Sequence, residues 1–463
     1  MIRTLARALQ ALAIATRPID PDTEKALERR WRELPTHAKT PAQLLGRRTA
    51  GCEGTHGVFP RCDLACTPCY HALGANSVRS DGSHTLAAID RQMRHLRAVR
   101  GPGQHAQLIG GEVTLLDPND HAAALETMIR HDRKPMSMTH GDFDYEYLER
   151  LAIGSDGRRR FDLLRFAGHF DSLMLGRRGI PRPQTEAELD PYRRRFVEQF
   201  ERLRREHGVR YDLAHTMTVT PRNLGQVAEV VRACLRMGFG MLSFQPAAYV
   251  GNPKRWREDF HQVSLDAVWE EIERGVGARI PWRALQMGDQ RCNRYACGIL
   301  AGGRWTPLLD DTDPRDLRVR DAFLDAVGGM DFDRPLGTLA IAIVRLLARY
   351  PRIVPLGLLW ITRVVRRAGL RRLLIGRPRA VSFVVHAFMD ADVARPAWDA
   401  LERGEIAADP GVRAAQERLE ACSYAMAHPE DDRLVPACVQ HAVLDPRENA
   451  NLVKLLPLGQ PPE

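Results

Sequence analysis

Residues 61–70 read Arg-Cys-Asp-Leu-Ala-Cys-Thr-Pro-Cys-Tyr, and this short stretch decides the fold and the chemistry that the sequence predicts. It brings Cys62, Cys66 and Cys69 together in one segment. A structural zinc ion needs four ligands, and no histidine follows at the spacing of a zinc finger. A 4Fe-4S cluster held by three thiolates keeps one iron free for a small molecule. The spacing therefore indicates an iron–sulfur cluster with one open iron.

A second motif, Gly110-Gly111-Glu112, follows further along the chain at the end of an expected strand. Glycines let the backbone approach a ligand closely, and the adjacent carboxylate can accept hydrogen bonds from an ammonium group. Gly-Gly-Glu arises easily by chance in a chain with 36 glycines, so its weight comes from its position.

Short apolar runs alternate with longer amphipathic stretches, which is the pattern of strand–helix units around a parallel sheet. In barrels of parallel strands, the ligand-binding groups lie at the carboxyl ends of the strands. The cysteine stretch and the Gly-Gly-Glu motif follow the first and second expected strands. The sequence thus predicts an α/β fold with a partial, six-unit barrel. The expected strands are residues 57–60, 105–110, 134–139, 163–169, 212–219 and 240–246.

The Cys-x3-Cys-x2-Cys spacing, the aromatic Tyr70 and the later Gly-Gly-Glu resemble the signature of radical S-adenosylmethionine (radical SAM) enzymes, over residues 51–275. The resemblance implies that Cys62, Cys66 and Cys69 hold a catalytic 4Fe-4S cluster whose open iron binds S-adenosylmethionine. It also implies a reductant such as flavodoxin or ferredoxin. Reduction would release a 5'-deoxyadenosyl radical that removes hydrogen from an unactivated C–H bond.

The same resemblance assigns the motif Gly110, Gly111 and Glu112 to the methionine end of S-adenosylmethionine, and Tyr70 to a cover over the cluster. Polar residues at further strand ends are candidates for holding the ribose, the adenine or the substrate. The alternative is that each of them caps the next helix or turn. These candidates are Ser172, Thr218 and Gln245.

Four further cysteines fall in two separated pairs, Cys292 with Cys297 and Cys422 with Cys438. Four thiolates could complete a second, fully ligated 4Fe-4S cluster or a zinc site. The alternative is buried free cysteines, since cysteine packs as a small hydrophobe. We favour the auxiliary cluster because free core cysteines have no reason to pair in this way. Cys52 is a spare that could replace one of the four.

Composition favours a cytoplasmic enzyme. The chain has 463 residues, 44% of them hydrophobic, enough for two or three domains. Its nine unevenly spaced cysteines suit metal ligation in a reducing compartment. The net charge of +9 suggests an anionic partner, and a lipid headgroup, a phosphate and nucleic acid are the three alternatives. No phosphate-binding loop, nucleophile elbow or zinc-protease helix is present. We interpret residues 1–16 as an amphipathic helix rather than a signal peptide.

Residues 334–379 contain eleven arginines and no acidic residue, together with dense apolar runs. The uncharged runs are too short to span a bilayer, which takes about 20 residues. Arginine-flanked amphipathic helices suit an anionic membrane interface, so the protein could be peripheral on the inner face of the membrane. The alternative is a buried helix pair with a solvated basic face. Nucleic acid is a weaker candidate, because the segment has few aromatic side chains for base stacking.

The tail narrows the resemblance to the tetraether-synthase-like group, which joins lipid alkyl chains or methylates pterin-type substrates. The matching stretches are Phe244-Gln245-Pro246, Ala387-Phe388-Met389-Asp390, Ala421-Cys422-Ser423-Tyr424 and Arg433-Leu434-Val435-Pro436-Ala437-Cys438.

We therefore predict a radical SAM enzyme that abstracts hydrogen from a lipid acyl or alkyl chain. It would have an N-terminal helical segment (1–50), a radical SAM barrel (51–275) and a C-terminal α-rich auxiliary iron–sulfur domain (276–463). One alternative is a radical SAM methyltransferase acting on a soluble heterocycle. Another is a non-enzymatic adaptor stabilised by zinc.

Overall fold

The structure is a computed structural model that describes residues 13–69, 75–251, 254, 256 and 258–455. One sheet of eleven strands runs through it, in the order β10-β9-β11-β8-β7-β5-β4-β3-β1-β12-β13. The strands of this sheet are β1 (Cys52–Gly54), β3 (His105–Leu108), β4 (Lys134–Thr139), β5 (Leu163–His169), β7 (Arg210–Val219), β8 (Met241–Pro246), β9 (Asn293–Ala301), β10 (Arg304–Pro307), β11 (Arg379–His386), β12 (Tyr424–His428) and β13 (Arg433–Pro436).

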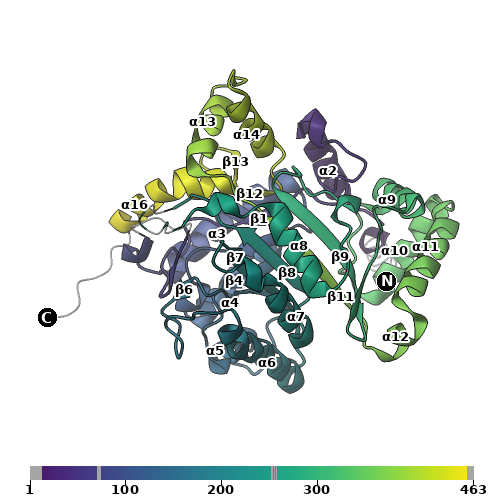
Figure 1. The fold of residues 1–463 in the computed structure, drawn as a ribbon, viewed down its shortest axis with the longest axis horizontal. Coiled ribbons are helices and arrows are strands. Elements are labelled where there is room, and N and C mark those ends of the chain that lie inside the picture. The colour runs from purple at the N-terminus through teal and green to yellow at the C-terminus, as the bar shows by residue number, and fades with distance from the viewer. Residues whose placement is uncertain (1–12, 70–74, 252–253, 255, 257, 456–463) are drawn as a thin grey trace, which may run out of the picture.

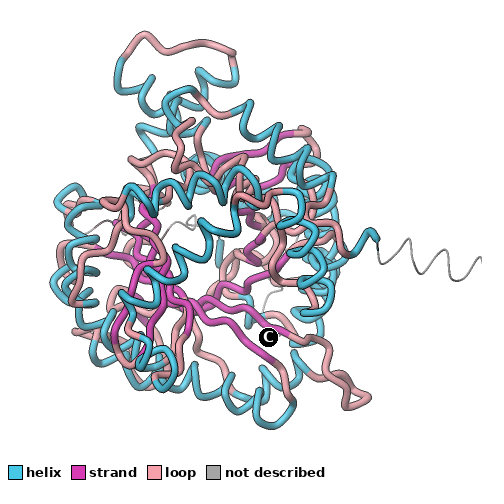
Figure 2. The backbone as a smooth tube through the Cα atoms, turned by 90° about the vertical axis from the view of Figure 1, so that its right-hand side faces the viewer, coloured by secondary structure: helices cyan, strands magenta, loops and turns pink. Residues whose placement is uncertain are grey.

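All neighbouring strands from β11 through to β12 pair in parallel, and antiparallel pairs occur only toward the two edges. The sheet curls into a partial barrel, with the strands inside and helices around them (Figures 1 and 2). This confirms the expected α/β fold. Two short strands, β2 (Ala65–Cys66) and β6 (Met174–Leu175), form a separate antiparallel pair.

The helices over the barrel begin and end where the sequence supplies caps. The hydroxyl of Ser264 accepts a hydrogen bond from the backbone N–H of Ala267 at the start of α8, and Gly277 ends α8 in the left-handed conformation. The barrel helices are α3 (Gly82–Arg100), α4 (Pro118–Arg130), α5 (Tyr145–Ala152), α6 (Asp190–His207), α7 (Val227–Met237) and α8 (Leu265–Val276). The remaining helices are α2 (Pro21–Glu33), α9 (Pro314–Val327), α10 (Leu336–Arg349), α11 (Ile353–Ala368), α12 (Leu370–Ile375), α13 (Ala391–Glu402), α14 (Pro410–Glu420), α15 (Ala437–Val439) and α16 (Asp445–Leu455).

Two expected strands, β4 and β5, have the predicted bounds, but the first expected strand is wrong. Residues 57–60 form a loop, because Gly57 adopts a left-handed φ of 61° and Pro60 has no N–H to donate. The first barrel strand is instead β1, which pairs with β3 on one side and β12 on the other.

Strands from the C-terminal part of the chain extend both edges of the barrel sheet. β9, β10 and β11 continue it beyond β8, while β12 and β13 continue it beyond β1. The segments beside these two edges are also in contact, since the side-chain amide of Asn293 donates a hydrogen bond to the Ser423 hydroxyl (3.1 Å). The strands β9 to β13, from the C-terminal part of the chain, therefore share one sheet with the barrel.

Candidate functional site

The cysteine loop leaves the carboxyl end of β1, where the barrel strands open. Cys66 belongs to β2, which pairs with β6 beyond the end of β5, and Thr67 donates its N–H to the Leu173 carbonyl oxygen (3.1 Å). The Cys66 and Cys69 side chains are hydrogen-bonded to each other, and Cys62 lies close enough to be affected by the charge of Cys69. The three thiols therefore converge in one place, as the sequence predicts.

The surroundings of Cys62 and Cys66 favour the protonated form of their thiols. Burial raises the pKa of Cys62 to about 12, and the charge of nearby Glu112 contributes. The hydrogen bond with Cys69 raises the pKa of Cys66 well above its usual value, and burial adds to this effect. Three soft sulfur donors in one place suit an iron–sulfur cluster, whose positive iron ions would favour the thiolate forms. Tyr70 lies outside the described residues.

A buried cation stands beside the loop, and no sequence motif identified it. Arg177 follows β6 and donates to the carbonyl oxygen of His140 (2.8 Å), while its guanidinium lies 4.9 Å from the centre of the Phe170 ring. Its Nη1 atom is buried and has no hydrogen-bond partner. The negative charge of Cys66, if ionised, would act on Arg177. An unpartnered donor of this kind fits an anionic group held at the three thiols.

His140 and Asp63 also adjoin the cysteine loop. The Nε2 atom of His140 lies 2.8 Å from a carboxylate oxygen of Asp63, and the ligand atoms of Cys62, Asp63 and His140 lie within 4.8 Å of one another. Burial alone would lower the pKa of His140, but the charges of Glu112 and Asp63 and the Asp63 hydrogen bond raise it. This arrangement ties the end of β4 to the cysteine loop.

The Gly-Gly-Glu motif packs directly on the cysteine loop. The N–H groups of Gly111 and Glu112 donate to the carbonyl oxygens of Phe59 (2.7 Å) and Arg61 (2.8 Å). A Cβ atom on Gly111 would lie 2.0 Å from the Arg61 carbonyl oxygen, so only glycine allows this approach. A Cβ atom on Gly110 would lie 2.8 Å from the Phe59 carbonyl oxygen, which is also too close.

The Glu112 carboxylate is buried and already hydrogen-bonded within the chain. It accepts from the backbone N–H of His140 (2.7 Å) and from the hydroxyls of Thr139 (2.6 Å) and Thr114 (2.7 Å). These bonds hold the ends of β3 and β4 together. Binding of S-adenosylmethionine by Gly110, Gly111 and Glu112 stays a prediction.

The other candidate ligands of the cofactor or substrate lie at neighbouring strand ends. Thr218 and Gln245 are paired across β7 and β8, and Ser172 follows β5. The backbone N–H of Thr218 donates to Asp171 (3.0 Å), and that of Ser172 donates to Glu186 (2.8 Å). The Ser172 hydroxyl is buried without a hydrogen-bond partner. The structure therefore groups all three around the barrel mouth.

Three of the four predicted auxiliary cysteines lie near one another. Cys292 precedes β9, Cys422 precedes β12, and Cys438 follows β13 in α15, so they come from segments at the two edges of the sheet. Burial raises the pKa of Cys438, and the neighbouring Cys422 and Cys292 raise it further. The Arg418 side chain donates to the Cys292 sulfur (3.2 Å).

Cys297 does not join this group. It lies within β9, where its side chain is hydrogen-bonded to Tyr295. An extended strand advances about 3.3 Å per residue, which separates Cys297 from Cys292. Cys52 and Cys422 are both partly buried and pack against the same small cluster of Tyr424, Met426 and Ala437. The spacing of the cysteines in the sequence did not show which of Cys52 and Cys297 lies near the other three. Their positions depend on how the strands pair.

A pair of stacked histidines joins the start of the cysteine loop to the C-terminal helix. The rings of His56 and His428 lie 4.0 Å apart, and the His56 Nδ1 atom is 3.0 Å from the Glu448 carboxylate in α16. The other ring nitrogen of His56 faces the Ala427 carbonyl oxygen, so both nitrogens meet acceptors. Burial would lower the pKa of His56, but these partners, Glu448 first, raise it.

We expect the His56–Glu448 pair to stabilise the fold at low pH. Because the pKa of His56 is higher in the folded state, its contribution is complete below the unfolded value of about 6.5 and is lost as the pH rises through the folded value. His56→Gln should therefore cost about 1–2 kcal/mol at pH 6 and less at pH 8.5. Urea unfolding at both pH values measures this. An equal loss at both would contradict it.

Similarity to known proteins is limited to parts of solved structures. No protein-family model and no curated protein matches the chain. Streptococcus suis SuiB bound to S-adenosylmethionine is 15% identical, with a TM-score of 0.34 over 48% of this chain and 46% of that chain. Native anSMEcpe with bound AdoMet and Kp18Cys peptide is 14% identical, with a TM-score of 0.32 over 48% and 58%. The chain thus spans about half the length of these structures.

Proposed function

We propose that this protein is a radical SAM enzyme whose catalytic 4Fe-4S cluster is held by Cys62, Cys66 and Cys69. The convergence of the three thiols at the carboxyl ends of a parallel barrel carries this proposal. When bound, the cluster and S-adenosylmethionine supply a 5'-deoxyadenosyl radical for hydrogen abstraction.

The chain's own residues position and enclose this chemistry. The β2–β6 pair fixes the cysteine loop against the end of β5, and Arg177 provides a buried positive charge beside it. Glu112 holds the ends of β3 and β4 in register with the loop through its hydrogen bonds to Thr139 and His140.

The test is anaerobic reconstitution with iron and sulfide, followed by reduction and addition of S-adenosylmethionine. Formation of 5'-deoxyadenosine is the expected result, and its absence in iron-loaded protein would contradict the proposal. Tightly bound zinc in place of iron would instead favour the zinc-stabilised adaptor.

A second cluster is proposed at Cys292, Cys422 and Cys438. Their common neighbourhood supports it, and the basic side chain of Arg418 suits an anionic cluster. A cluster here would fasten the two edges of the sheet together. Cys297 has no support as the fourth ligand. Cys52 is the better placed alternative, because it packs against the same small buried cluster as Cys422.

For the substrate, we propose a lipid acyl or alkyl chain, with the protein peripheral on an anionic membrane. This rests on the tail resemblance to the tetraether-synthase-like group and on the surface of α10, α11 and α12. These helices lie together on one side of the barrel, opposite α16 (Figure 1). Their exposed large apolar side chains are Leu336, Ile341, Val344, Val354, Leu358, Leu359, Ile361, Leu370, Leu374 and Ile375.

Most arginines of this surface are not neutralised within the chain. Arg363 and Arg367 both pair with Asp316 of α9 (2.9 and 2.6 Å). Within the described part of the chain, several others have no carboxylate at ion-pair distance, and such cations attract anionic headgroups. They are Arg349, Arg352, Arg366, Arg371, Arg372 and Arg377. No described helix combines the length and apolar character needed to cross a bilayer.

This surface lies toward the amino ends of the barrel strands, away from the cysteine loop. Asp331 and Asp333, just before α10, pair with Lys134 at the start of β4 (2.6 and 3.0 Å), and α12 leads into the start of β11. Membrane attachment through this surface would therefore leave the barrel mouth away from the contact. This separation favours a second candidate, the methylation of a soluble heterocycle, whose extra product would be S-adenosylhomocysteine.

We expect the membrane proposal to depend on the exposed leucines. Leu358→Gln together with Leu374→Gln should weaken binding to phosphatidylglycerol vesicles by about tenfold or more, because each exposed side chain loses apolar burial in the interface. Ile406→Gln is a matched control, since Ile406 is 80% exposed but lies outside the segment. Vesicle co-sedimentation measures this. Equal binding by neutral and anionic vesicles, or no binding by the unmodified protein, would contradict it.

A further inference from the structure

A cavity adjoins the cysteine loop. It has a volume of about 330 Å³, and Thr67, which lies between Cys66 and Cys69, forms part of its wall. Leu173 and Leu175, from the chain around β6, line another part. Because β2 and β6 are hydrogen-bonded together, this cavity is held in a fixed position next to the three thiols.

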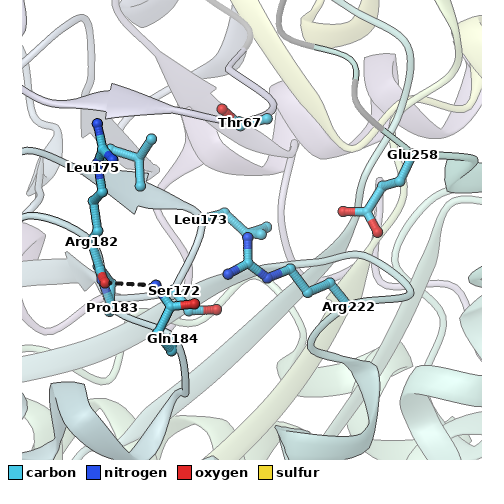
Figure 3. Close-up of a pocket in the computed structure, with 9 residues that line it drawn as sticks. All are labelled: Thr67, Ser172, Leu173, Leu175, Arg182, Pro183, Gln184, Arg222 and Glu258. Atoms are coloured by element: carbon cyan, nitrogen blue, oxygen red, sulfur yellow. Dashed lines mark hydrogen bonds between the residues drawn. The ribbon is translucent and has the colours of Figure 1, made fainter.

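Two arginines face this cavity without an ion-pair partner. Figure 3 shows Arg222 reaching toward Leu173 while Arg182 lies along another wall. In the described part of the chain, neither guanidinium has a carboxylate at ion-pair distance, although Glu258 also lines the cavity. Guanidinium groups bind phosphate oxygens in pairs, and two of them match the charge of a phosphate dianion.

A buried hydroxyl gives a second, independent indication of a ligand. Ser172 lines the same cavity and is 1% exposed, yet its Oγ atom has no hydrogen-bond partner. A buried hydroxyl without a partner is costly, and an oxygen-rich ligand in the cavity would accept its hydrogen bond. Glu258 could accept hydrogen bonds from a hydroxyl or ammonium group of the same ligand.

We propose that this cavity binds a phosphate group of the substrate, with Arg222 and Ser172 as its ligands and Arg182 adding positive charge from another wall. The inference rests on the proposed function for its placement beside the catalytic cluster. It narrows the substrate to a phosphorylated molecule, which is either a soluble phosphate ester or a phospholipid headgroup.

The test is calorimetric titration of the reconstituted protein with inorganic phosphate. We expect saturable binding that weakens by about tenfold in Arg222→Gln and again in the double variant with Arg182→Gln. Arg178→Gln is the matched control, because Arg178 is exposed and already paired with Asp142 (3.1 Å). No phosphate binding, or equal affinity in all variants, would overturn the proposal.

The substrate source is distinguished by two phosphate esters. Tighter binding of dihexanoyl phosphatidic acid than of glycerol 3-phosphate, with the same dependence on Arg222, would indicate a lipid headgroup. Equal affinities would indicate a soluble phosphate ester, and both results support the phosphate subsite.

A parallel titration with S-adenosylmethionine separates the subsite from the proposed function. Suppose that Arg222→Gln lowers the affinity for S-adenosylmethionine and that phosphate does not compete with S-adenosylmethionine for the unmodified protein. The arginines would then bind the carboxylate of the cofactor, and the proposal would fail. Phosphate binding without any cleavage of S-adenosylmethionine would contradict the radical SAM function and leave the phosphate site intact.

Discussion

Replacing any one of Cys62, Cys66 and Cys69 by alanine is expected to abolish the formation of 5'-deoxyadenosine by the reconstituted, reduced protein. Each thiol supplies one of only three protein ligands of the cluster. Loss of a residue that only supports a metal ligand usually costs up to about 100-fold, so loss of a ligand itself should lower the rate by more than about 100-fold. The hydrogen bond between Cys66 and Cys69 indicates that the thiols act as a group. Anaerobic assays of product per chain measure this effect.

Two other cysteines provide the controls. Cys234→Ala should retain both iron and activity, because Cys234 is buried within α7 and away from both cysteine groups. Cys438→Ala should lower the iron content from about eight to about four per chain if the auxiliary cluster exists. Full activity in the Cys66→Ala variant would remove the basis of the radical SAM proposal, whatever the iron content.

The Arg133→Met variant is expected to lose about 3–5 kcal/mol of unfolding free energy, because it leaves a buried carboxylate without its partner. Both side chains of the Arg133–Glu53 pair are fully buried, and the guanidinium contacts both carboxylate oxygens at 2.8 Å. Arg133 also donates to the Gly101 carbonyl oxygen. The pair fixes β1, from which the cysteine loop departs.

The double variant Arg133→Met with Glu53→Met should recover part of this loss, since the unpartnered carboxylate is removed while the buried Arg100 beside it keeps its charge. Arg91→Met should change stability little, because Arg91 and Glu430 form an exposed pair at 3.7 Å. Denaturant unfolding measures all three variants. Surface ion pairs contribute up to about 1 kcal/mol. If Arg133→Met lowered the unfolding free energy by less than this, water or another group would be compensating the charge of Glu53.

Local sequence signals predicted the barrel well. Apolar runs between amphipathic stretches gave β4 and β5 their bounds, and β8 was predicted to within a residue. These strands are buried in a parallel sheet, so their composition alone marks them. The first strand was misplaced because β1 has only three residues and includes the charged Glu53, whose burial depends on Arg133.

The sequence by itself determined that Cys62, Cys66 and Cys69 lie close together, because three cysteines within one short segment are neighbours in any fold. It also determined that the Gly-Gly-Glu motif follows a strand. Only the tertiary structure decided which distant groups meet. It brought Arg177 and His140 to the loop, separated Cys297 from Cys292, and placed Arg182 and Arg222 around one cavity. These relations depend on strand order and on contacts across long sequence separations, which local composition does not encode.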